Sequence, residues 1–215
     1  NWILPIFNLT YNQDVFFVLI TISFLLIAIL KGMYWKHAKL LFMGVYARRY
    51  SNQFLREENV FTERVNILTS LIMLINFTLI FVKLLMKDDI SSILIIFTSI
   101  GSYFLGRIII VRLLGSLFHL EEVSKLAVFF SLLFDKTLGF LISPLVLCIY
   151  FFAFDISHIV ILIVLFIAFI LLLLKIVWLW WIGTNSFGLS KVYIFLYLCL
   201  LEISPILLLV KEVFY

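Results

Sequence analysis

The sequence predicts an all-α fold, a polytopic bundle of transmembrane helices with about six spans and one or two interfacial helices. Hydrophobic residues make up 65% of the 215 residues and charged residues only 13%. A soluble domain needs a larger charged fraction to cover its surface. Long apolar runs recur between short polar segments, and about 20 apolar residues let a helix cross a bilayer. We therefore interpret residues 1–215 as a single transmembrane helical domain.

Six apolar runs are the predicted spans, and aromatic residues typical of the membrane interface close two of them. Asn76 and Lys83 interrupt the apolar character of the second run, and Pro144 lies inside the fourth. Residues 123–136 are too short and too charged at their ends to span, so we expect an interfacial or partly embedded helix there. An extra span at this place would reverse the C-terminal half. The predicted spans are 15–34, 67–86, 90–115, 137–154, 156–182 and 191–211.

The longest polar stretch, residues 31–66, is strongly basic and fixes the predicted orientation. It holds seven Lys or Arg residues against three Glu residues. Cytoplasmic loops of membrane proteins carry the excess of positive charge. With this loop in the cytoplasm, only Lys83, Lys87 and Lys211 lie on the opposite side. We expect a multi-pass protein of a bacterial inner (cytoplasmic) membrane with both termini in the periplasm.

The cations of this loop favour lipid as their partner. Leu41, Val45 and Tyr46 recur at helical spacing opposite the arginines, which indicates either a helix on the membrane surface or a solvated loop helix. Because the charges adjoin apolar runs, we expect anionic lipid headgroups, and not nucleic acid, as their counterions. The candidate headgroup contacts are Lys36, Lys39, Arg48 and Arg49.

A carboxylate in the sixth predicted span is the candidate intramembrane polar site. Glu202 lies about halfway along the run, and Pro205 follows about one turn later. An ionised carboxylate at that depth costs on the order of 2.5–3.5 kcal/mol, so we expect it to be protonated, to face protein or to meet a cation. Lys175 in the preceding span is one candidate cation, and Arg107 with Arg112 is another. A packing contact, a proton or ion path and a contact with a partner subunit all remain open.

The third predicted span carries residues suited to helix packing or partner contact. Ser102 and Gly106 are four residues apart, a spacing that lets another helix approach closely. Arg112 and His119 share one helix face further along, where the helix leaves the membrane or meets a neighbour. We expect a structural role for both pairs.

Enzyme and cofactor motifs are absent from the sequence. There is no HExxH, GxSxG or phosphate-binding glycine loop. Glu121, Glu122 and Lys125 form a charged cluster that lacks further metal ligands, and the three histidines lie near predicted loops instead of facing each other at mid-span, as a haem requires. We expect no catalytic residues, no metal and no cofactor.

The last apolar run has an aromatic-Leu-Tyr-Leu-Cys segment, Phe195–Cys199, followed by Glu202 and Pro205. This pattern resembles the C-terminal signature of an uncharacterised family of polytopic inner-membrane proteins from Bacteroidota, classed as a domain of unknown function. The segment Phe195–Lys211 reads FLYLCLLEISPILLLVK. The resemblance implies an inner-membrane location and a six-span fold, and it implies no particular activity. The matching positions are Tyr197, Leu198, Cys199, Glu202 and Pro205.

Three functional hypotheses remain. The first, which we favour, is a non-enzymatic accessory or assembly subunit of a larger membrane complex in the cell envelope, with other integral membrane subunits as partners. The second is a proton- or ion-coupled transporter that uses Glu202. The third is a membrane enzyme that acts on lipid through Glu121 or His119.

Overall fold

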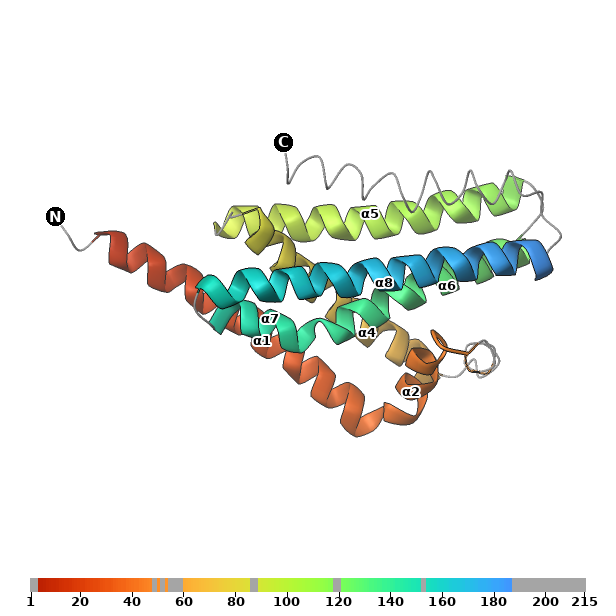
Figure 1. The fold of residues 1–215 in the computed structure, drawn as a ribbon, viewed down its shortest axis with the longest axis horizontal. Helices are drawn as coiled ribbons and strands as arrows, with labels where there is room; N and C mark the ends of the chain where they lie inside the picture. The colour runs from red at the N-terminus through yellow and green to blue at the C-terminus, as the bar shows by residue number, and fades with distance from the viewer. Residues whose placement is uncertain are drawn as a thin grey trace. The chain divides into compact units, whose positions relative to one another are not determined.

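A computed structural model of the chain describes residues 4–47, 50, 53, 60–85, 89–117, 121–151 and 154–186. Every regular element within these ranges is an α-helix (Figure 1). The predicted all-helical fold class is therefore confirmed. The helices are α1 (Leu4–Met33), α2 (Trp35–Met43), α4 (Val60–Leu84), α5 (Ile90–Leu117), α6 (Glu121–Leu141), α7 (Ser143–Phe151) and α8 (Phe154–Ser186).

Several of these helices have the length and composition of membrane spans. Four qualify individually, over Asp14–Met33, Val60–Leu84, Ile90–Leu117 and Ile159–Trp178, and the bent pair α6–α7 makes a fifth if it counts as one span. The part of the chain that the structure describes thus fits a multi-pass membrane protein with four or five spans, fewer than the six predicted. The predicted sixth span, 191–211, lies outside the described residues.

Several hydroxyl side chains in these apolar helices bond to the backbone of their own helix. Thr21 donates to the carbonyl of Phe17 at 2.8 Å, and Thr78 donates to that of Leu74 at 2.8 Å. Without water to bond in the hydrocarbon, a hydroxyl needs such an internal acceptor. A span can therefore carry serine and threonine without a polar face.

The chain divides into two compact units, and the first contains most of the ordered core. This unit comprises residues 1–101 and 135–167. Within it α4 is the central helix, since it packs against α1, α2 and α7. The largest share of buried positions also falls on α4, where 56% of the most apolar window is buried, against 22% for α1.

A broken helix completes the packing around α4. Helices α6 and α7 meet at a 41° bend, with Ile142 as the turn between them (Figure 1). Pro144 lacks an N–H group, so it cannot donate to the carbonyl of Phe140 as a continuous helix would require. The bend thus falls at the proline that the sequence placed inside the fourth span. The predicted start of the fourth span at residue 137 does not coincide with a helix boundary. Helix α6 begins at Glu121 and runs without a break past residue 136.

The basic stretch 31–66 is helical at both ends. Helix α2 follows α1 after a turn at Tyr34, and α4 begins at Val60 (Figure 1). Of the three residues predicted to share an apolar face, Leu41 and Val45 are buried, whereas Tyr46 is 80% exposed. Within α2 itself, Ala38 and Leu41 are buried while Lys36 and Lys39 are exposed, so the helix packs against the rest of the first unit by one side only.

The second unit is described for residues 102–117, 121–134 and 168–186. Its buried residues include Phe130, whose ring stacks on Trp178 with centroids 6.1 Å apart. Two cations, Arg107 and Lys175, are also buried in this unit.

Candidate functional site

Three helices of the first unit meet at a buried set of hydrogen bonds, which we call the polar junction: Ser23 of α1, Asn76 of α4 and Gly139 of α6. The Ser23 hydroxyl donates to Oδ1 of Asn76 at 3.0 Å. Nδ2 of Asn76 donates to the carbonyl oxygen of Gly139 at 2.8 Å. Ser23 and Asn76 are each 1% exposed. One amide side chain therefore links two other helices.

Ser23 and Asn76 lie well inside α1 and α4, whereas Gly139 lies in the last turn of α6, just before the bend. Ser23 is near the middle of the candidate span Asp14–Met33, and Gly139 precedes the α6–α7 bend by three residues. At such depth an amide without partners costs several kcal/mol, on the order of 2–7. Because Asn76 both accepts and donates there, this cost is avoided only when the three helices are together.

Gly139 lets α4 and α6 approach more closely than any larger residue could. A Cβ atom built on Gly139 would lie 2.6 Å from Cα of Met73 and 2.8 Å from its Cβ. The nearer atom belongs to the backbone of α4, so a rotamer change cannot relieve the overlap. The short distance between the backbones is also what brings Asn76 within reach of the Gly139 carbonyl.

Two further polar contacts connect α4 with α6 and α7. Nζ of Lys136, a side chain that is 4% exposed, donates to Oδ1 of Asn66. The Tyr150 hydroxyl donates to the carbonyl of Leu79 at 2.7 Å. Going from Asn66 to Leu79, the partners advance from residue 136 to residue 150. Helix α4 and the α6–α7 pair therefore run in the same direction.

A second buried hydroxyl, that of Ser143, lies at the α6–α7 bend. Ser143 is 2% exposed, and its Oγ has no hydrogen-bond partner in the structure as described. The side chains of the junction are one hydroxyl and one amide, neither of which titrates at physiological pH. The junction can fix helices relative to one another, but it offers no group that could accept and release a proton.

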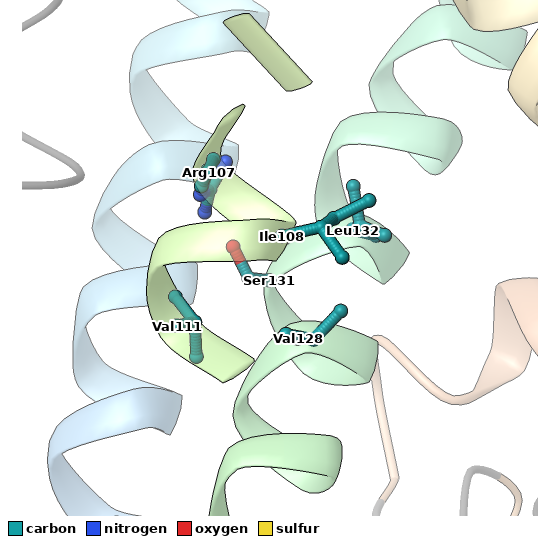
Figure 2. Close-up of a pocket in the computed structure, with 6 residues that line it drawn as sticks. All are labelled: Arg107, Ile108, Val111, Val128, Ser131 and Leu132. Atoms are coloured by element: carbon teal, nitrogen blue, oxygen red, sulfur yellow. The ribbon is translucent and has the colours of Figure 1, made fainter. Parts of the chain in front are cut away.

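The second unit contains a small hollow beside a buried arginine. Figure 2 shows Arg107 with two neighbours on α5 and three residues of α6, and the Ser131 hydroxyl is directed towards α5. The hollow has a volume of about 10 Å³, which is room for about one water molecule and far too little for a small-molecule ligand. Its lining residues are Arg107, Ile108, Val111, Val128, Ser131 and Leu132.

The structure gives surroundings for some of the predicted site residues. Lys175 is 4% exposed, which fits a cation that must meet protein. Ser102, Arg112, Lys36 and Lys39 are exposed. The packing roles of Ser102 and Arg112 and the headgroup contacts of Lys36 and Lys39 remain predictions. Five residues named by the same predictions lie outside the described parts of the chain: Glu202, Pro205, His119, Arg48 and Arg49.

The predicted close approach at Gly106 also stays a prediction. Among the residues that the structure describes, no atom lies within 4 Å of a Cβ built there. Any helix that packs closely on this position must therefore come from elsewhere. Gly139, which the sequence interpretation passed over, makes the close contact in the first unit.

The described ranges contain no cluster of side chains suited to binding a metal ion. No group of three or more His, Cys, Asp or Glu residues is close enough to hold an ion there. The polar groups that come together in these ranges are mainly amides, hydroxyls and carbonyls that connect helices.

These features define a class: a multi-pass α-helical membrane protein whose helices are joined by buried polar contacts. The chain belongs to the family described as Domain of unknown function (DUF4271), whose model matches residues 16–213. Comparison with curated proteins and with solved structures finds no match.

Proposed function

We propose that the protein is a non-enzymatic accessory or assembly subunit of a larger membrane complex. The observation that carries this proposal is the uneven burial of its spans. Only 17% of the most apolar window of α5 is buried, and 22% of those of α1 and α8, against 56% for α4. A span with so little buried surface faces lipid or another protein. Ser102 and Gly106 are small residues on α5 that would let a helix of another protein approach closely.

The polar junction supports the same function. Its side chains are fully used in joining α1, α4 and α6. Polar groups that serve only to join helices suit a packing role better than a chemical one. We further propose six spans, a bacterial inner membrane and periplasmic termini. The parallel course of α4 and α6–α7 supports one oppositely directed span between them, and the basic stretch 31–66 supports placing its loop in the cytoplasm.

Replacing Gly106 by leucine tests the proposal. The bulky side chain would close the α5 surface to a partner helix, while the open space around Gly106 leaves the described helices of this chain undisturbed. We expect Gly106→Leu to lose most of the stoichiometric partner that co-purifies with the wild type from native membranes in mild detergent.

The matched control is Gly32→Leu on α1, where a Cβ also meets no described atom within 4 Å. We expect this variant to keep the partner. A wild-type protein that is isolated monodisperse and without a partner would contradict the proposal. So would equal retention of the partner by both variants.

A transporter is the second candidate, and the buried cations of the second unit favour it. Arg107 and Lys175 are 5% and 4% exposed on long apolar helices. Buried charges within spans often mark ion or proton paths. Glu202 is the acid that the sequence places inside an apolar run, and it could form a charge pair with either cation.

Glu202→Gln separates the two functions. A transporter predicts that this substitution abolishes proton or ion flux into liposomes that contain the purified protein, while the protein stays folded. An accessory subunit predicts no flux in either form. Flux by the wild type that the substitution abolishes would overturn the subunit proposal.

A further inference from the structure

We propose that the outward side of α2 binds the phosphate of an anionic phospholipid. We call this side the α2 outer face and define it as Trp35, Lys36 and Lys39. The inference goes beyond a role as an accessory subunit, since lipid binding requires no protein partner.

The helical positions of these residues bring them together. Trp35 and Lys39 are four residues apart, and Lys36 and Lys39 are three apart, so all three lie on neighbouring parts of one helix surface. Trp35 is 40% exposed, and both lysines are exposed. On the opposite side of α2, Ala38 and Leu41 are 0% and 1% exposed. The helix thus has one side in the unit and one side open.

Aromatic contacts hold α2 in this rotation. The ring of Phe42 packs against Phe140 with centroids 4.5 Å apart. The His37 ring stacks on Phe61 at 5.9 Å with nearly parallel planes. His37 holds the inner side of α2, and Phe42, which is seven residues after Trp35, holds the edge beside the outer face, so this face is already formed before any ligand arrives. A preformed surface loses less conformational entropy on binding.

The place of α2 in the chain puts this face at headgroup level. The candidate span Asp14–Met33 ends two residues before α2 begins, and the next candidate span starts at Val60. Helix α2 therefore lies between the end of one span and the start of the next. Tryptophan is enriched at this level of the membrane, where lysine can reach phosphate while its alkyl chain stays in contact with apolar groups.

Charge complementarity selects the anionic lipid as the occupant. The stretch 31–66 carries seven cations against three acids. A basic segment beside a span attracts anionic headgroups with about 1 kcal/mol for each Lys or Arg, and a zwitterionic headgroup lacks the net charge to do so. An acidic segment of another protein would be the competing occupant.

Native mass spectrometry of the full chain, titrated with phosphatidylglycerol or phosphatidylcholine, tests the site. We expect the wild type to prefer phosphatidylglycerol. The double substitution Lys36→Gln and Lys39→Gln should weaken phosphatidylglycerol binding roughly 30-fold, from the loss of two cation contacts. Phosphatidylcholine binding should stay unchanged. Because both side chains are exposed, the substitutions leave the packed side of α2 intact.

Lys125→Gln is the control, because Lys125 is an exposed lysine on α6 in the second unit. We expect this variant to keep nearly all phosphatidylglycerol affinity. An equal loss in the control would show that general charge, and not the α2 outer face, attracts the lipid. A wild type without preference for phosphatidylglycerol would also overturn the proposal, and would leave an acidic protein segment as the occupant of this face.

Discussion

Replacing Gly139 by alanine should destabilise the protein by about 1–3 kcal/mol, the usual effect of forcing a methyl group into a packed interior. The added Cβ would lie 2.6 Å from Cα of Met73, so the backbones of α4 and α6 must separate. In an open helix the same change would stabilise by about 1 kcal/mol, because alanine is the better helix former. Chemical or thermal unfolding in detergent measures the difference.

Two further variants make this prediction specific. Gly32→Ala is the control, since no described atom lies within 4 Å of its added Cβ, and we expect no loss of stability. Met73→Ala should not rescue Gly139→Ala, because the nearest atom is the Met73 Cα, which alanine retains. A stable Gly139→Ala protein, or a full rescue, would show that the two helices are not in backbone contact.

Asn76→Leu is the second substitution with a large expected effect, a loss of about 1–3 kcal/mol. It removes the acceptor of Ser23 and the donor to Gly139 together. A buried acceptor left without a donor costs about 1–3 kcal/mol, although single hydrogen bonds between spans average only about 0.6 kcal/mol. The Gly139 carbonyl should account for most of the loss, since a serine hydroxyl can bond back to its own helix.

Thr78→Val is the matched control for Asn76→Leu. Thr78 is 2% exposed in the same helix, and the bond that it donates ends on Leu74, within α4. Because the hydroxyl only bonds back to its own helix, losing this local bond should change the unfolding free energy by about 0.6 kcal/mol or less. If both substitutions had the same effect, the contacts between helices would contribute nothing beyond the loss of a polar group.

The apolar runs predicted the four single spans of α1, α4, α5 and α8, because a bilayer requires long apolar segments whatever their neighbours. The sequence also placed Asn76 inside a span, and it placed Pro144 where the structure has the α6–α7 bend. It could not show that Asn76 pairs with residues 53 and 63 positions away. Such pairs depend on which helix faces are turned towards each other, and a single sequence does not encode that in any local pattern.

Lys136 illustrates why a helix boundary was misplaced in the prediction. Its charge favoured the end of an interfacial segment, whereas in the structure the side chain is buried in a continuous helix and donates to Asn66. The same limit applies to small residues. Ser102 and Gly106 have the spacing for close packing, yet Gly139 is the residue with an α4 backbone beside it.

The central claim is that the polar junction is a closed packing contact and not part of a water-lined path. Its most direct test is the reaction of Ser23→Cys, made without the native cysteines Cys148 and Cys199, with a water-soluble maleimide in membranes. We predict no labelling of residue 23 in the folded protein and full labelling after denaturation, with Lys39→Cys on the exposed side of α2 labelled in both states. Rapid labelling of residue 23 in the folded protein would contradict the claim.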